Sequence, residues 1–439
     1  MLNRVQIFAL RHPHNILAQL LLPIISLIEG LLANNPTYLD KQRLTFGPNF
    51  CCAGQVVMGE FQTLEQALTS PQARTWRLGT SVLESHHLPN VDLGSRTVFL
   101  LALSDQGAGG DGAHAAFRQC METYLMNEAA IARQGDETAR QLLEQLATDY
   151  QDMPHGVGGS FFDDPSRGLM RFMVCYLHYV LFGLDPQDQP SMNLLTQLYY
   201  ATGGTKYYFA GLGKVLQVLN VSGARAWPQL IQQAAAIYEA SPAFVDFQEG
   251  NPDFHNMTKG ELARLMTSIM SIAALQGPLH LAYTAMGYRL LPAYTGQKTA
   301  EIDPTQIWDQ LDLEDHEALK GYLLECARLW MPVSASHRVA VEPFAVKMMD
   351  KEYTFPAGTK VLIPMILGML DRSFWGSTVY EFNAQRENLC PYHMGFNAVG
   401  DRSNGRICPG RDIALKMLID MLKAIGQVRR AACASEQSP

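Results

Sequence analysis

The sequence lacks the patterns of several protein classes. Only 17% of its 439 residues are charged, and 42 Asp and Glu residues outnumber 34 Lys and Arg residues, which gives a net charge of -8. A protein that follows the phosphate backbone of nucleic acid needs a basic face, and this composition supplies no basic excess. The eight cysteines include no CxxC pair and lack the close spacing of a secreted disulfide framework. We therefore expect a small-molecule or protein partner, no nucleic acid, and a reducing, cytoplasmic location.

A long uninterrupted apolar run is also missing. The N-terminal segment NILAQLLLPIISLIEGLLANN follows a basic start, but Gln19, Pro23 and Glu29 interrupt it. A membrane-spanning helix needs about twenty nearly uninterrupted apolar residues. We therefore expect the apolar segment within residues 1–40 to form a docking helix, with membrane insertion or peripheral membrane contact through residues 14–33 as the alternative.

Helical periodicity dominates the rest of the chain. ETARQLLEQLATDYQ and TQLYYATGGTKYYFAGLGKVLQVL are largely helical, GQVVMGEF and RTVFLLALSD are strand-like, and YTFPAGTKVLIPMIL reads as a turn that feeds a strand. No repeat, low-complexity tract or Pro- or Ser-rich linker divides the chain. The sequence predicts a mainly α fold with a small β region, in which residues 41–439 form one domain.

A glycine-rich motif points to a different fold. GAGGDG, from Gly107 to Gly112, fits the GxGxxG fingerprint of dinucleotide-binding proteins and stands between a strand-like and a helical segment. That fingerprint also requires a second parallel strand that ends in an acidic residue about twenty positions later, and the chain there stays helical. A glycine loop that leads into the next helix fits better than a nicotinamide site.

A single cysteine near the C-terminus stands in a setting that favours an anion. In NGRICPGRDIAL, Cys408 lies between Arg406 and Arg411 and directly before a predicted helix. The helix dipole, the free backbone N–H groups and the two guanidiniums would all favour its thiolate. Such a sulfur can be a nucleophile, a redox thiol or a metal ligand.

Motifs upstream of Cys408 narrow these choices. In LLECARLWMPVSASHRVAV, Glu325 and Arg328 are three residues apart on one helical face, where they can pair. PAGTKVLIP and DRSFWGSTVYEFNAQRENL follow in that order, and the series ends in Cys408, Gly410 and Ala414. From Gly112 to its end, the chain resembles the cytochrome P450 superfamily.

The resemblance implies a fold, a cofactor and roles for particular residues. It implies the cytochrome P450 fold with heme b, whose iron Cys408 would hold as the axial thiolate ligand. Glu325 and Arg328 correspond to the family's ExxR pair, and Arg386 to the arginine that completes its structural triad. The residues that match heme-propionate contacts are His114, Arg118, Arg338 and Arg406, all of which offer charge-assisted hydrogen bonds to carboxylates.

Two segments depart from the family pattern. In DRSNGRICPG, Asp401 stands where the family has an aromatic residue, and Asn404 replaces the first glycine, which indicates a rearranged loop. We place the distal helix in ELARLMTSIMSIAALQGPLHLAYTAMG. Ordinary monooxygenases of the family carry an acid and an alcohol there to deliver protons, whereas this chain has Gln276, Gly277 and Pro278. Because proline removes a helical N–H, we expect the helix to bend over the iron.

The missing acid–alcohol pair resembles family branches that use hydrogen peroxide or lipid hydroperoxides, or that rearrange endoperoxides. In these branches the O–O bond is already present in the substrate. Gln276 would then orient a peroxide oxygen, and His280, about one turn further, is either an acid–base group or a core histidine. The fatty-acid peroxygenase branch has an arginine before the proline, where this chain has Gly277, so carboxylate anchoring at that position is unsupported.

Charge near the C-terminus favours an alternative. From Arg402 to Arg430 the chain has seven basic residues and two acidic ones, Asp412 and Asp420. This excess indicates a basic proximal face that would dock an acidic electron donor. The basic residues are Arg402, Arg406, Arg411, Lys416, Lys423, Arg429 and Arg430. The sequence thus predicts an oxidoreductase that acts on an apolar, lipid-like substrate with a peroxide or hydroperoxide. An O2-dependent monooxygenase supplied by a ferredoxin or reductase, and a non-catalytic heme sensor, are the alternatives.

Overall fold

The computed structural model describes only part of the chain. The described residues are Ile16 and the ranges 35–52, 55–69, 77–78, 91–92, 97–98, 113–156, 159–202, 226–254, 256–270, 274–294, 296–340, 343–400 and 407–436. The glycine motif at 107–112, Arg402, Arg406 and all of the apolar segment 14–33 except Ile16 lie outside them. No helix of the described part is long and apolar enough to cross a membrane.

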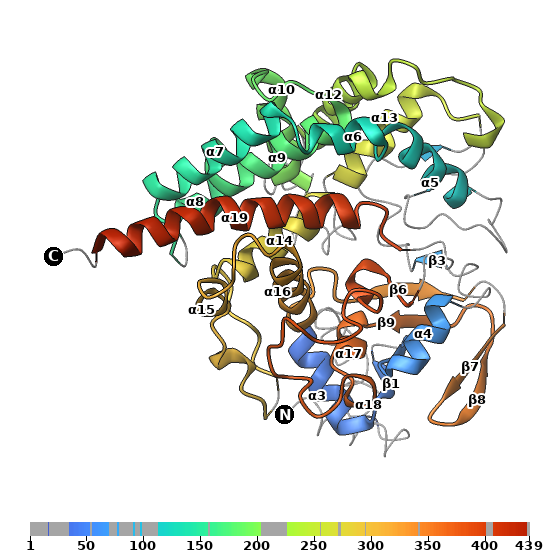
Figure 1. Cartoon of the computed structure of the whole chain (residues 1–439). Coiled ribbons are helices and arrows are strands. Elements are labelled where there is room, and N and C mark those ends of the chain that lie inside the picture. Colours follow the sequence, from blue (N-terminus) through green and yellow to red (C-terminus); the bar gives the residue numbers. More distant parts are fainter. Residues whose placement is uncertain are drawn as a thin grey trace.

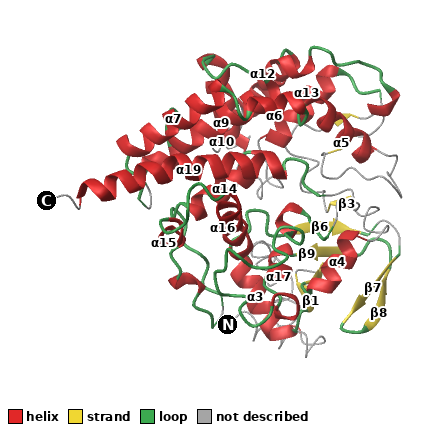
Figure 2. Ribbon diagram, viewed as in Figure 1, coloured by secondary structure: helices red, strands yellow, loops and turns green. Residues whose placement is uncertain are grey.

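Helices make up most of the described structure, as the sequence predicts (Figure 2). The helices are α3 (Pro36–Phe46), α4 (Phe61–Thr69), α5 (Ala113–Tyr124), α6 (Glu128–Arg133), α7 (Glu137–Asp152), α8 (Ser160–Asp163), α9 (Gly168–Phe182), α10 (Gln189–Thr202), α12 (Trp227–Glu239), α13 (Lys259–Ile269), α14 (Gln276–Ala285), α15 (Pro304–Trp308), α16 (His316–Leu329), α17 (Met365–Met369), α18 (Arg372–Trp375) and α19 (Arg411–Glu436). Helix α19 runs between α7 and α9 on one side and α14 and α16 on the other (Figure 1).

The described strands are short and gather at one side of the molecule (Figure 2). They are β1 (Asn49–Cys52), β2 (Gln55–Met58), β3 (Arg77–Leu78), β4 (Val91–Asp92), β5 (Thr97–Val98), β6 (Ser336–Val339), β7 (Phe344–Met348), β8 (Lys351–Phe355) and β9 (Lys360–Ile363). The main sheet has the order β1-β2-β9-β6-β3, in which only the β2–β9 pair is parallel. The predicted turn before a strand at PAGTKVLIP is confirmed, because a turn leads from β8 into β9.

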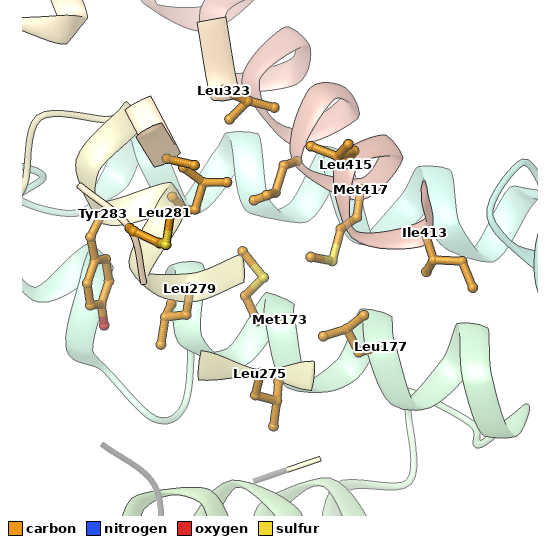
Figure 3. Close-up of a cluster of buried hydrophobic side chains, with 14 of the residues drawn as sticks. Met173, Leu177, Leu275, Leu279, Leu281, Tyr283, Leu323, Ile413, Leu415 and Met417 are labelled. Carbon is orange, nitrogen blue, oxygen red and sulfur yellow. The ribbon is translucent and has the colours of Figure 1, made fainter. Parts of the chain in front are cut away.

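The core of the helical part is centred on α9. Every residue of α9 except Tyr179 is buried, so this helix is enclosed on all sides and packs against several neighbours. Leu275 and Leu279 lie in a cluster with Met173 and Leu177 of α9, and Ile413 and Met417 of α19 and Leu323 of α16 belong to it (Figure 3). Each buried leucine contributes about 1.5–3 kcal/mol. This packing fixes one face of α14.

The predicted distal helix changes its hydrogen-bond spacing between α13 and α14. Helix α13 ends at Ile269, and α14 begins at Gln276. Between them the N–H of Leu275 donates to the carbonyl of Met270, five residues earlier, at 3.2 Å, which is the spacing of a π-type turn. Pro278 therefore stands in the first turn of α14, where a proline is tolerated because its N–H would have no partner in the helix. The expected bend over the iron stays a prediction, and the described residues on both sides of 271–273 show a π-type turn, which is one cause of helix bending.

Candidate functional site

A buried ion pair joins two residues of α16. The Nε and Nη2 atoms of Arg328 donate to the two carboxylate oxygens of Glu325, each at 2.7 Å, in the bidentate arrangement that makes such bonds strong. Both side chains are fully buried. The pairing predicted from their spacing of three residues is thus present.

A third charge and several carbonyls complete this network. Arg386 donates to Glu325 through Nε and Nη2, both at 3.2 Å, and the N–H of Asn383 donates to the same carboxylate at 3.0 Å. The guanidinium of Arg328 also reaches the carbonyls of Met369 and Val379, at 3.0 and 2.6 Å. The network ties the irregular segment 369–386 to α16 and satisfies the buried charges.

Cys408 lies directly before α19, as predicted, and its backbone is held from both sides. Its N–H donates to the carbonyl of Phe396 at 2.8 Å, and its own carbonyl accepts from the N–H of Arg411 at 3.4 Å. The sequence did not predict this backbone contact, because Phe396 stands twelve residues before the cysteine. Asp401 and Asn404 lie outside the described residues.

The electrostatics of the Cys408 thiol differ from the expectation. Burial raises the pKa of this thiol, while the N–H of Gly410 and the guanidiniums of Arg118 and Arg411 act to lower it. The pKa is raised on balance, so the expected preference for the thiolate is wrong for the thiol in isolation. A bound metal would reverse this balance, because a coordinating thiol is deprotonated. The side chain remains partly exposed.

One of the residues matched to propionate contacts lies beside Cys408. Nη1 of Arg118, on α5, donates to the carbonyl of Ile407 at 2.5 Å, and its Nε pairs with Glu122 at 3.1 Å. His114 precedes Arg118 by one turn on the same helix. The structure places Arg338 on β6, opposite Leu78 of β3 and Val361 of β9. The side chains of His114 and Arg338 and the whole of Arg406 are outside the described part.

The start of α14 carries an unsatisfied donor. The Nε2 atom of Gln276 is buried and has no hydrogen-bond partner within the described residues. A Cβ atom built on Gly277 would have no atom within 4 Å, so the space beside it is open, whereas Pro278 is buried. An amide N–H that is buried without a partner is costly. This point therefore favours an incoming hydrogen-bond acceptor.

His280 has a specific partner that the sequence did not reveal. Its Nδ1 atom lies 2.6 Å from Nη1 of Arg289, which follows the end of α14. Burial and, to a smaller degree, Arg289 lower the pKa of His280 to about 4. His280 is therefore neutral at pH 7, and it is linked to a cation instead of packing only against apolar atoms.

The basic residues of α19 are engaged inside the molecule. Lys423 forms an ion pair with Glu314. The guanidinium of Arg429 forms an ion pair of 2.7 Å with Asp309 and lies 4.8 Å from the ring centre of Trp308. Lys416 pairs with Asp420, Arg411 with Asp412, and Arg430 donates to the carbonyl of Leu311. Of the expected docking face, Arg411, Lys416, Lys423 and Arg429 are thus paired with acids of 309–314 and of α19 itself, and Arg402 and Arg406 lie outside the described residues.

Comparison with solved structures places this arrangement in a known fold. The chain is similar to cytochrome P450 CREJ, with 14% identity, a TM-score of 0.58, and 90% of this chain and 89% of that one covered. The chain has the cytochrome P450 fold. A Tepidiphilus thermophilus P450 heme domain gives 13% identity and a TM-score of 0.57, with 89% and 86% covered. Cytochrome P450 BioI was solved with an acyl carrier protein that carries hexadec-9Z-enoic acid. It has 13% identity and a TM-score of 0.57, and the match covers 91% of this chain and 92% of that one.

The cytochrome P450 fold was predicted from the sequence, and these comparisons confirm it. The similarity extends over about nine-tenths of the chain, so it includes both the helical part and the strands. No protein-family model matches the chain, and a comparison with curated proteins gives no match. At 13–14% identity the likeness shows the fold, and the chemistry has to be argued from the side chains.

Proposed function

We propose that the protein is a heme-thiolate oxidoreductase of the cytochrome P450 type that acts on an apolar, lipid-like substrate and uses a peroxide or hydroperoxide O–O bond. Three features of the described structure support this proposal. They are the cysteine loop, the polar groups at the start of α14, and the internal pairing of the basic residues on α19.

The cysteine loop fits a heme. Cys408 lies on a backbone that is held at Phe396 and at the start of α19. Arg118 brings a cation to the same loop. We assign Cys408 as the axial ligand and Arg118, with His114, Arg338 and Arg406, as propionate contacts. A heme bound here supplies an iron whose reactivity toward O–O bonds is set by the thiolate.

The residues in and around α14 are the reason for proposing a peroxide, and not O2, as the oxidant. The sequence has no Asp or Glu between Glu261 and Glu301, a stretch that includes both α13 and α14. The hydroxyls of Thr267 and Thr284 donate hydrogen bonds to backbone carbonyls of their own helices, those of Arg264 and His280 respectively. Delivery of protons to bound O2 normally needs a positioned acid. A substrate that brings its own O–O bond requires less of this machinery, and the unpartnered Gln276 amide is suited to hold one of its oxygens.

Two further observations agree with this assignment. The charges on α19 that would attract an acidic electron donor are paired with Asp309, Glu314 and Asp420, which weakens the case for docking of a ferredoxin. One solved neighbour holds a protein-linked hexadecenoic acid, which is consistent with a lipid-like substrate for this fold.

The proposal is tested by mixing heme-loaded protein with a polyunsaturated fatty-acid hydroperoxide, without reductase or NADPH, and following the conjugated-diene absorbance. We expect rapid consumption in the native protein and none in Cys408→Ser. Product analysis would separate isomerisation, cleavage and oxygen transfer. No consumption by the native protein, together with turnover when a ferredoxin, its reductase and NADPH are added, would establish an O2-dependent monooxygenase instead. Tight heme binding without either reaction would indicate a sensor.

A further inference from the structure

The contact between His280 and Arg289 defines which ring nitrogen of His280 carries a proton. A guanidinium has only donors, so Nδ1 of His280, 2.6 Å from Nη1 of Arg289, must accept the hydrogen bond. A neutral imidazole then carries its proton on Nε2. The tautomer follows from the identity of the partner, and it makes Nε2 of His280 a donor.

The groups around this pair hold Arg289 in place and leave His280 uncharged. The guanidinium of Arg289 lies 5.1 Å from the ring centre of Tyr283, whose ring is 5.8 Å from that of His280. The carboxylate of Asp163, on α8, accepts hydrogen bonds from the hydroxyls of Tyr283, at 3.1 Å, and Tyr288. The carboxylate is thus bound to phenols, and no direct contact with the imidazole competes with Arg289.

His280 and Gln276 lie on one face of α14. They are four residues apart, so their side chains are neighbours one turn apart along the helix. Leu275 and Leu279 take up the face that packs toward α9 and α19 (Figure 3). Nε2 of Gln276 is buried and lacks a partner among the residues that the structure describes, and the contact of Nδ1 with Arg289 leaves Nε2 of His280 as a second hydrogen-bond donor.

We propose that Arg289 is a positioning residue that holds His280 as a neutral Nε2–H donor, so that Gln276 and His280 together bind an acceptor oxygen of the substrate. The inference rests on the proposed function and deepens it. Two N–H donors without an adjacent acid suit a hydroperoxide or carboxylate oxygen. His280 contributes a hydrogen bond in this role and does not transfer a proton.

The first test measures the state of His280 directly, in the diamagnetic ferrous–CO protein, by NMR of the imidazole nitrogens. We expect the Nε2–H tautomer and no protonation of His280 between pH 5.5 and 8. In Arg289→Met the Nδ1–H tautomer should become populated, while the pKa of His280 should rise only slightly, because burial is the larger cause of its low value. Arg264→Met, which removes an exposed arginine of α13, is the matched control and should leave His280 unchanged. An Nδ1–H tautomer in the native protein, or titration of His280 near pH 6.5, would overturn the proposal.

The second test asks whether the donor matters for the substrate. We expect kcat/KM for the fatty-acid hydroperoxide to fall about tenfold in His280→Phe, and less in His280→Asn, which retains an N–H donor. Arg289→Lys, which can still donate to Nδ1, should retain most activity, and Arg289→Met, which cannot, should lose nearly as much activity as His280→Phe. Equal losses in the Phe and Asn variants, or full activity in Arg289→Met, would refute the role of His280 as a donor.

The two tests separate this inference from the proposed function. If native protein with an intact thiolate spectrum consumes no hydroperoxide, the proposed function fails, and the tautomer measured by NMR still decides the role of Arg289. If hydroperoxide is consumed but the His280 and Arg289 variants match the native protein, only the further inference fails.

Discussion

The backbone N–H of Cys408 donates a hydrogen bond of 2.8 Å to the carbonyl of Phe396, across an interval of twelve residues. This bond fixes the position of the cysteine before α19 independently of the residues that lie between. It therefore holds the backbone of the residue that we propose as the heme ligand, although burial raises the pKa of its thiol.

Replacing Cys408 with Ser should abolish the spectrum of a thiolate-ligated heme together with turnover. Oxygen is a weaker donor to the iron and does not supply the electron density of a thiolate. The measurement is the absorption spectrum of the ferrous–CO complex. Cys390→Ser, at a partly exposed thiol elsewhere in the chain, is the control and should keep the native spectrum. A native ferrous–CO spectrum in Cys408→Ser would remove Cys408 from the site.

Replacing Glu325 with Gln should destabilise the fold by about 3–5 kcal/mol, because it leaves the buried guanidinium of Arg328 without its counter-ion. Chemical denaturation of the heme-loaded protein measures this loss. The control is Glu317→Gln on the same helix, whose exposed pair with Lys320 contributes less than about 1 kcal/mol. Similar stability of the two variants would show that the buried network contributes little.

Replacing Gln276 with Ala should lower turnover of the hydroperoxide several-fold without loss of heme. The buried amide has no partner in the described structure, so its removal should change the stability of the fold little. A bound substrate oxygen would lose its hydrogen-bond donor. Initial rates and the heme absorbance of the same samples provide the two readings. Gln141→Ala on the exposed side of α7 serves as the control. Full activity of Gln276→Ala would exclude this side chain from the mechanism.

Acidification from pH 6.5 to 5 should destabilise the protein. Burial lowers the pKa of both His178 and His393 to about 4 in the folded state, whereas each titrates near 6.5 when unfolded. Between these values the unfolded chain binds more protons, so stability is full above pH 6.5 and falls as the pH drops, by up to about 3 kcal/mol per histidine.

Denaturation midpoints between pH 7.5 and 5 measure this dependence. His178 has a polar partner at each nitrogen, the carbonyl of Val174 and the hydroxyl of Tyr238. His178→Asn should be less stable at pH 7.5 and should lose part of the slope. A native midpoint that stays constant over this range would show that the two histidines do not stay neutral in the folded protein.

Local patterns in the sequence were enough to predict part of this structure. The spacing of Glu325 and Arg328 places them on one helical face, and Cys408 stands before a clear amphipathic helix, so these positions follow from periodicity. Phe396 did not follow, because the number of residues in a loop does not determine which of them lie next to each other. The π-type turn before Gln276 was not predicted, because Pro278 fits both a bend and a first turn.

Contacts between distant segments were beyond the sequence. Lys423 and Arg429 look like a free basic surface until Asp309 and Glu314, more than a hundred residues earlier, are brought against them. The link between His280 and Arg289 spans the end of a helix, where no regular period relates the two positions. Charge counts along the chain predict neither contact.

The network around Glu325 also bears on how the molecule opens. Segment 369–386 has only the short helix α18 of regular structure, yet the carbonyls of Met369, Val379 and Glu381 accept hydrogen bonds from the buried guanidinium of Arg328. A loop held in this way cannot fray alone, because its release would expose a charged pair of α16. In hydrogen exchange, this irregular stretch and the centre of α16 should behave as one cooperative unit.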